Sequence, residues 1–337
     1  MATFVVGPWE VDSSLIRIVS GNTTPLEDTA SLWVNFPKAV QDVAGKHGYL
    51  TGFSSARSSE SDQPTKVLIN SVLRFPDAPS ATAAATEMGA EAMTAEGRDK
   101  PYVPHPIPGH PEAVGMVGEV TRDDKALATV QSFTPHGIYV LYQWSQAEVG
   151  GADAATAMVV RALDLGLPRI DSFRPADPWR FADLPTDPMN LLLRTLPLLP
   201  NDRYFSPMGS YPPQAALHYE TDPIASTRLF ETADVEAVAM INSVVYRTRD
   251  AESAHLIADF AAQQFKSVPT DRQAAGVPGI PDSRCFDRRS NDAAMKAAQS
   301  QFFCVVTSGK YSFKTSSQQL DDAHQRAAAQ FLMLIAP

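Results

Sequence analysis

The chain contains one sequence pattern twice, and this internal repeat constrains the fold more than any other feature. Residues 69–88 read INSVLRFPDAPSATAAATEM, and residues 241–260 read INSVVYRTRDAESAHLIADF. The features that follow also occur in the same order, including a Pro-Gly turn at residues 108–111 and again at 278–281. Chance similarity does not keep such a register, so the sequence predicts a tandem duplication of one structural unit.

Apolar periodicity and turn signals predict the order β-α-β-β-β-α in each copy. The first copy is expected to have strands at residues 66–75, 113–120, 126–133 and 138–144, and helices after Asp77 and at 153–165. The second is expected to have strands at 238–246, around Cys285, at 301–306 and at 311–315, and helices after Asp250 and at 322–335. The expected fold class is α+β, with two antiparallel sheets that each carry their helices on one face.

Two shorter segments carry local predictions. Gly137 lies in the last hairpin of the first copy and is expected to take the positive φ that its turn needs. The polar, serine-rich residues 54–65 predict a loop.

The repeat divides the chain into three parts. Residues 1–172 are expected to form the N-terminal repeat with an N-terminal extension, and residues 235–337 the C-terminal repeat. Between them, residues 173–234 hold ten of the 27 prolines, which prevent long regular elements and stiffen the chain. Because this part also contains many aromatic and leucine residues, we expect a connector that packs across both copies.

Charge and hydropathy argue against several partners. The net charge is -10 and there is no Lys/Arg-rich run, so neither nucleic acid nor an anionic lipid surface is expected as the main partner. No apolar run is long enough to span a membrane. The first residues lack the basic and apolar regions of a signal peptide, so we expect either a cytoplasmic protein or a mature fragment with an added methionine.

The two cysteines, Cys285 and Cys304, lie on the predicted second and third strands of the second copy. Neighbouring antiparallel strands can bring two such side chains face to face. The matched positions in the first copy are Gly115 and Ser132, which are both small. We therefore expect a disulfide and an oxidising compartment, and the alternative is a pair of unrelated buried thiols.

Several longer segments resemble a known family. They are GPWEVDSSLI at residues 7–16, HGYLTGFSSARSS at 47–59, DPMNLLLRTLP at 187–197 and ALHYETDP at 216–223, together with the cysteine pair. They are similar to a family of actinobacterial cell-envelope lipoproteins, of mycobacterial or nocardial type, known as a domain of unknown function. The resemblance implies a secreted protein whose signal peptide and lipid-anchored cysteine precede Met1. It brings no catalytic residues.

No motif in the sequence indicates a catalytic, metal or cofactor site. There is no G-x-S-x-G elbow and no phosphate-binding glycine loop, so we assign no catalytic residue and no cofactor. His105, His110 and Glu112 lie close in sequence and could offer metal ligands. Their spacing matches no known zinc arrangement, and we interpret the histidines as surface residues of a proline-rich loop, with no metal site.

Three aromatic residues on one predicted strand form the candidate ligand-binding site: Tyr139, Tyr142 and Trp144. Because strand residues alternate between faces, Tyr139 and Trp144 point in opposite directions. At least one of them therefore faces away from the core between the sheet and its helices. Such a residue could line a groove for an apolar or sugar-bearing ligand, or the proline-rich connector could cover it.

The function expected from these features is non-enzymatic. We expect an extracytoplasmic lipoprotein of the cell envelope that binds or senses a lipid-like or other envelope ligand at the junction of the two copies. The first alternative is a protein-interaction or scaffold subunit of an envelope complex, and the second is a hydrolase acting on an envelope lipid or glycan. The membrane would be reached only through the N-terminal lipid anchor that the resemblance implies.

Overall fold

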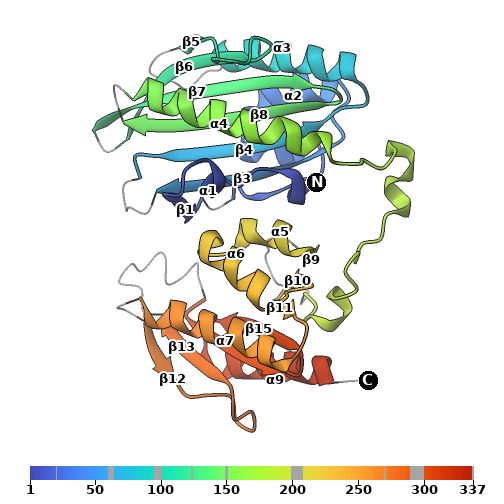
Figure 1. Cartoon of the computed structure of the whole chain (residues 1–337), viewed down its shortest axis with the longest axis vertical. Helices are drawn as coiled ribbons and strands as arrows, with labels where there is room; N and C mark the ends of the chain where they lie inside the picture. The colour runs from blue at the N-terminus through green and yellow to red at the C-terminus, as the bar shows by residue number, and fades with distance from the viewer. Residues whose placement is uncertain are drawn as a thin grey trace. The chain divides into compact units, whose positions relative to one another are not determined.

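The computed structural model describes residues 1–19, 21–59, 64–94, 101–122, 124–148, 151–198, 208–268, 271–288 and 300–335. These residues form two compact units (Figure 1). The first contains Met1–Leu184 and a separate short segment, His218–Ile224. The second contains Pro185–Leu217 and Ala225–Pro337. The predicted connector, residues 173–234, thus contributes segments to each unit, and its packing across both copies stays a prediction.

The first unit is built on an antiparallel sheet. Its strands are β1 (Leu15–Ile18), β2 (Thr24–Leu26), β3 (Thr51–Ser59), β4 (Val67–Arg74), β5 (Val103–Pro104), β6 (Val114–Arg122), β7 (Lys125–His136) and β8 (Tyr139–Glu148). They lie in the order β1-β3-β4-β8-β7-β6-β5, and β2 also pairs with β3.

The sheet of the second unit repeats this topology. Its strands are β9 (Gly209–Tyr211), β10 (Ala237–Met240), β11 (Ser243–Arg247), β12 (Asp271–Ala274), β13 (Arg284–Arg288), β14 (Phe302–Ser308) and β15 (Tyr311–Ser317). The run β10-β11-β15-β14-β13-β12 matches β3-β4-β8-β7-β6-β5 strand for strand. The predicted α+β class with two antiparallel sheets is confirmed, and the shared strand order supports the duplication.

The matched turns also share their backbone conformation. Gly137 and Gly309, in the β7–β8 and β14–β15 hairpins, both have φ of +54°. This left-handed conformation is unstrained for glycine and disfavoured for other residues. The predicted positive φ at Gly137 is therefore confirmed, and it recurs in the second copy.

Four long helices cover the two sheets: α3 (Ala78–Thr94), α4 (Ala152–Asp171), α7 (Ala251–Lys266) and α9 (Leu320–Ile335). The predicted start signals are confirmed, because Asp77 accepts a hydrogen bond from the Ser80 amide and Asp250 accepts one from the Ser253 amide, each at 2.8 Å. These carboxylates satisfy amides that have no partner inside the helix.

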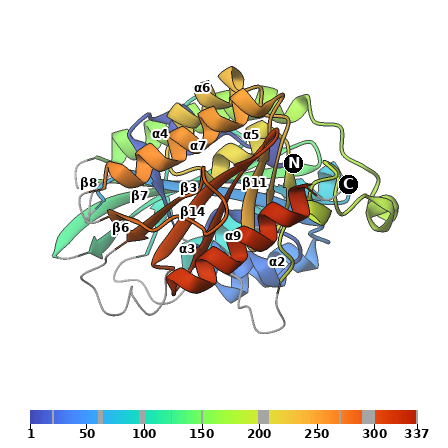
Figure 2. The same ribbon diagram turned by 90° about the horizontal axis from the view of Figure 1, so that it is seen from below.

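The prediction that both helices of a copy cover one face is wrong. In β8, Val140 packs in the cluster that contains α3, whereas the next residue, Leu141, packs with α4. Val305 and Val306 of β14 are divided in the same way between α7 and α9, which Figure 2 shows on opposite sides of this strand. The reason is that the central strands carry apolar residues on both faces, so each face needs a cover.

The remaining helices are short. They are α1 (Pro8–Val11), α2 (Lys38–Lys46), α5 (Pro213–Ala216) and α6 (Pro223–Thr232), with 3-10 helices at Ala2–Phe4, Ala30–Val34, Pro178–Asp183, Leu192–Arg194 and Leu217–Tyr219. In the first unit, α2 lies against α3 and α1 lies against α4. Helix α2 therefore adds to the cover on the α3 face of the first sheet, and α1 adds to the cover on the α4 face.

Two local predictions are corrected. Residues 54–59 were expected in a loop but belong to β3, where Ser54 and Ser55 are fully buried; residues 60–63 lie outside the described part of the chain. Polar side chains in this strand are buried because other side chains hydrogen-bond to them, which composition does not reveal. The single strand expected at 238–246 is a hairpin, in which Met240 of β10 pairs with Val244 of β11.

A buried arginine joins β3 to the segment His218–Ile224. The side chain of Arg57 is fully buried, and its guanidinium donates to the backbone oxygens of Ile16, His218 and Glu220, the last two at 2.8 Å. The indole ring of Trp9 lies 5.2 Å from the guanidinium carbon. Burial lowers the pKa of Arg57 to about 10, with the charges of Glu220 and Asp222 acting against that shift. The group therefore stays charged at neutral pH.

Replacing Arg57 by methionine should destabilise the first unit by about 3 kcal/mol or more, because buried carbonyls lose their charged donor. All four tryptophans lie in this unit, so tryptophan fluorescence during urea unfolding reports its stability. Arg161→Met, at an exposed position of α4, is the matched control and should leave the unfolding midpoint nearly unchanged. Equal midpoints for Arg57→Met and the wild type would contradict this account.

The two cysteines form the expected disulfide. Cys285 of β13 and Cys304 of β14 are directly paired across the strands and are joined by a disulfide, with their Cα atoms 4.1 Å apart. In the first unit, Gly115 and Ser132 are the corresponding direct pair between β6 and β7. The bridge therefore occupies a position that both copies share and that only the second copy has cross-linked.

Removing the bridge with Cys285→Ala and Cys304→Ala should lower the free energy of unfolding of the second unit by about 3 kcal/mol, because the unfolded chain gains conformational freedom. Hydrogen exchange of β13 and β14, followed by mass spectrometry, measures this loss locally. A reducing agent should have the same effect on the wild type and none on the double variant. If hydrogen exchange of β13 and β14 were unchanged in the double variant and in the reduced wild type, the bridge would not stabilise these strands.

Candidate functional site

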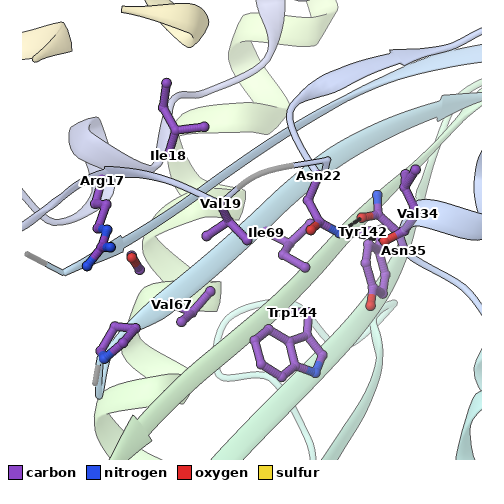
Figure 3. A pocket seen from close by; sticks show the side chains of 12 residues that line it. Arg17, Ile18, Val19, Asn22, Val34, Asn35, Val67, Ile69, Tyr142 and Trp144 are labelled. Atoms are coloured by element: carbon purple, nitrogen blue, oxygen red, sulfur yellow. Dashed lines mark hydrogen bonds between the residues drawn. The ribbon is translucent and has the colours of Figure 1, made fainter. Parts of the chain in front are cut away.

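A pocket of about 420 Å³ lies in the first unit, on the sheet face that carries α3 (Figure 3). Its lining comes from β1 and the loop after it, the end of the 3-10 helix Ala30–Val34, strands β3, β4 and β8, and Pro64 ahead of β4. The lining residues are Arg17, Ile18, Val19, Asn22, Val34, Asn35, Ser58, Pro64, Val67, Ile69, Tyr142 and Trp144.

Strand pairing determines which residues form the floor of the pocket. Ser58 of β3 lies directly opposite Val67 of β4, and Ile69 of β4 lies directly opposite Trp144 of β8. Because side chains of directly paired residues lie on the same face, these four residues form a continuous surface. Figure 3 shows Ile69 and Trp144 side by side on neighbouring strands.

The pocket is located where the helical cover of this face ends. Helix α3 contacts β6, β7 and β8, and α2 packs with Leu73 and Phe75 at the other end of β4. Neither helix packs over the part of the face around Val67. Residues that follow β1 close this part from the side, and the space left between them and the floor is the pocket.

A network of amide and hydroxyl groups forms one end of the pocket. The Asn22 amide nitrogen donates to the backbone oxygen of Val34 and, at 3.0 Å, to the amide oxygen of Asn35. The Asn35 amide nitrogen donates to the hydroxyls of Ser54 and Ser71, at 3.0 Å and 3.2 Å. These bonds tie the loop after β1 and the end of the 3-10 helix to the sheet, which fixes this wall.

Tyr142 limits the depth of the pocket. Its ring lies 4.5 Å from that of Phe36 and 4.9 Å from that of Phe133, and only 2% of the residue is exposed. Trp144, two residues further along β8, is half-buried at the edge of the same apolar cluster. The mouth is more open, because Arg17 and Ile18 are both exposed.

The structure separates the three aromatic residues of the predicted ligand site. Tyr142 and Trp144 line the pocket, whereas Tyr139 lies on the opposite face, near Phe173 and α4. Burial raises the pKa of Tyr139, and the charge of Arg74 acts in the opposite direction. That these residues bind a ligand stays a prediction.

Sequence reasoning missed most of the remaining pocket residues. Asn22 and Asn35 belong to no motif, and they reach the site because β1, β2 and the 3-10 helix fold back over β3. A partial signal was the contrast between the copies. Tyr311 corresponds to Tyr139 in the matched hairpins, so Lys314 and Ser316 correspond to Tyr142 and Trp144. The aromatic side chains of the pocket are therefore a feature of the first copy.

A buried serine and histidine form a pair away from the pocket. The Ser55 hydroxyl lies 2.8 Å from Nδ1 of His218, and Nε2 of His218 lies 3.1 Å from the backbone oxygen of Ala2. Ser55 points to the face opposite that of Ser54 and Ser58, and both members of the pair are buried. Among the described residues that line the pocket, none is a histidine.

The histidines of the proline-rich loop contact α4. Nε2 of His105 lies 2.9 Å from the Thr156 hydroxyl, and Nε2 of His110 lies 3.1 Å from an Asp164 carboxylate oxygen. The interpretation of both as surface residues is wrong for His110, which is buried because the loop packs onto the helix.

In the second unit, His324 lies near Cys285 and Cys304. The sulfur atoms of the two cysteines are bonded to each other, so they do not offer thiolates to a metal ion.

His218 should make the stability of the first unit depend on pH. Burial lowers the pKa of His218 to about 4, although the backbone of Ala2 and the charge of Glu10 favour its protonated form. Its pKa in the unfolded chain is about 6.5, so as the pH falls below that value only the unfolded state takes up the proton. This contribution should lower stability by about 3 kcal/mol between pH 6.5 and pH 4, and it should be absent above that range.

The measurement is the urea midpoint by tryptophan fluorescence across this pH range, for the wild type and His218→Gln. The amide of glutamine does not titrate, so the variant should lose this part of the pH dependence. Glu10 titrates in both proteins: burial alone would raise its pKa, but hydrogen bonds from Arg169 and the Gly7 amide bring the pKa below its usual value. Parallel curves for the two proteins would contradict the assignment to His218.

None of the helices in the described parts of the chain combines the length and the apolar character that crossing a membrane requires.

A comparison with curated proteins gave no match. Among solved structures, the extracellular domain of PknH from Mycobacterium tuberculosis is similar at 12% identity and a TM-score of 0.33, over 49% of this chain and 94% of that one. A likeness of this size carries no argument about function.

Family comparison covers nearly the whole chain. The domain of unknown function DUF7373 matches with its N-terminal part at residues 1–186 and with its C-terminal part at residues 191–336. These ranges agree with a two-domain layout. The chain belongs to the DUF7373 family.

Proposed function

We propose that this protein is a non-enzymatic binding protein of the cell envelope that holds a lipid-like or other small envelope ligand in the pocket of its first unit. The observation that carries the proposal is the pocket itself, whose floor joins the aliphatic side chains of Val67 and Ile69 to the indole of Trp144. Ligand sites in proteins are concave, mostly apolar and of this order of volume, with a few polar groups that orient the ligand.

The rigidity of the walls supports this proposal. Asn35 holds the end of the 3-10 helix to Ser54 and Ser71 of the sheet, and Tyr142 is fixed between two phenylalanine rings. A preformed pocket loses less conformational entropy when a ligand binds, so more of the contact energy appears as affinity.

The proposed location outside the cytoplasm has separate support. The disulfide between Cys285 and Cys304 fits an oxidising compartment, since such bonds are rare in reducing cytosol. The assignment to an actinobacterial lipoprotein, lipid-anchored or secreted, comes from the sequence resemblance. The proposal places the ligand in a pocket inside the first unit, and nothing tests the earlier expectation of a ligand at the junction of the two copies.

A second candidate function, a protein-interaction or scaffold subunit, is favoured by apolar residues on the second unit. Leu193 is 90% exposed, and Leu332 and Ile335, one turn apart on α9, are 61% and 56% exposed. The 3-10 helix that contains Leu193 contacts α9, so the three residues belong to neighbouring elements. Large exposed apolar side chains on neighbouring elements are a feature of protein interaction sites.

The experiment is native mass spectrometry of the full chain after incubation with a lipid extract of actinobacterial envelopes. The wild type should retain a bound molecule, and Ser58→Phe should not, because the added ring would occupy the space above Val67. Ser172→Phe, which adds the same ring at an exposed position at the end of α4, is the control and should bind as the wild type does. Circular dichroism and thermal melting confirm that each variant is folded.

Two results would contradict the proposal. Recovery of ligand-free wild type from every extract would argue against small-molecule binding and would favour the interaction function. Equal binding by the wild type and Ser58→Phe would show that the molecule binds elsewhere on the protein.

A further inference from the structure

The amide groups that line the pocket donate their hydrogen bonds to the protein. Both partners of the Asn35 amide nitrogen are serine hydroxyls of the sheet, and both partners of the Asn22 amide nitrogen belong to residues 34 and 35. An amide nitrogen has two hydrogens, so neither group has a further one to offer a ligand. The amide oxygen of Asn35 already accepts from Asn22.

The pocket therefore presents fewer donors than its composition suggests. Among the lining residues, Tyr142 directs its hydroxyl to Gln131, at 3.4 Å, and Arg17 is at the exposed mouth. Two further polar groups are the hydroxyl of Ser58 and the single indole N–H of Trp144. The other lining residues are aliphatic: Ile18, Val19, Val34, Pro64, Val67 and Ile69.

The aromatic strand alone is compatible with a sugar-bearing ligand and with an apolar one, and this lining favours the apolar ligand. A sugar carries hydroxyl groups around its ring, and each one that enters the pocket loses water and needs a partner. A hydrocarbon chain needs none, and it gains free energy in proportion to the apolar area that it buries. The side walls and floor supply such area between Ile18 and Ile69.

We infer that the pocket takes a single hydrocarbon chain, acyl or prenyl in chemistry, and that the polar head of the ligand stays at the mouth beside Arg17. This inference rests on the proposed binding function and names the class of its ligand. The chain lies over Val67 and Ile69, contacts the indole of Trp144, and ends against Tyr142.

The test is a titration of the full protein with alkyl phosphocholines of stepwise increasing chain length, each below its micelle concentration, by isothermal calorimetry. Each methylene that enters the pocket should raise the affinity about fourfold, since burial of one CH₂ contributes about 0.8 kcal/mol. The gain should stop at the length that fills the cavity, with one chain bound per protein. Adsorption to the surface would give neither this limit nor this stoichiometry.

Variants place the chain in the pocket. In Ser58→Phe the gain should stop at a shorter chain length or binding should be lost, whereas Ser172→Phe should behave as the wild type does. Ligand binding should also shift the tryptophan emission to shorter wavelength, because the chain displaces water from the half-buried Trp144. Trp144→Phe should lose this shift, and calorimetry should show a lower affinity, because the chain contacts the indole.

Failure of the inference and failure of the proposed function give different results. If oligosaccharides bind in a way that Ser58→Phe abolishes while alkyl chains of every length do not bind, the hydrocarbon inference is wrong and the binding function stands. If neither class binds the folded wild type, the binding function itself fails. An affinity independent of chain length would also overturn the inference, because a buried chain must show the methylene increment.

Discussion

The need to cover both faces of each sheet determines most of this structure. The central strands β8 and β14 alternate between side chains that belong to different apolar clusters, so neither face can be left to solvent. One long helix on each face is the response in both copies. On the α3 face of the first unit, the cover comes from α3 and the shorter α2, and neither helix reaches the part of the face around Val67. The pocket is the part of the face that remains.

The sequence predicted the features that depend on local patterns or on the repeat. Asp77 and Asp250 at helix starts, Gly137 in its hairpin and the pairing of Cys285 with Cys304 follow from side-chain chemistry at one or two positions. The repeated strand order followed from the register of the two copies. Each of these signals lies within a few residues or within one matched pair.

The features that the sequence did not predict depend on distant partners. The serines of β3 are typical of a loop in composition. They are buried in a strand because Asn35 and His218, which are distant in sequence, hydrogen-bond to them. The sequence also did not predict that the two helices of a copy lie on opposite faces of the sheet. A strand that is buried on both faces shows the same alternation of side chains whether its helices share one face or lie on two. Of the candidate site, Tyr142 and Trp144 were identified as residues on one strand. Asn22 and Asn35 reach the pocket only through folding of the N-terminal extension.

The position of Arg57 has a consequence for the biosynthesis of the protein. Two of its three backbone acceptors, the oxygens of His218 and Glu220, are made more than a hundred and fifty residues after β3. Until those residues have left the ribosome, two of the three backbone acceptors of the guanidinium are missing, so Arg57 cannot be buried with its full set of hydrogen bonds. The first unit should therefore complete its fold only after synthesis has passed Glu220, within the part of the sequence that lies between the two repeats.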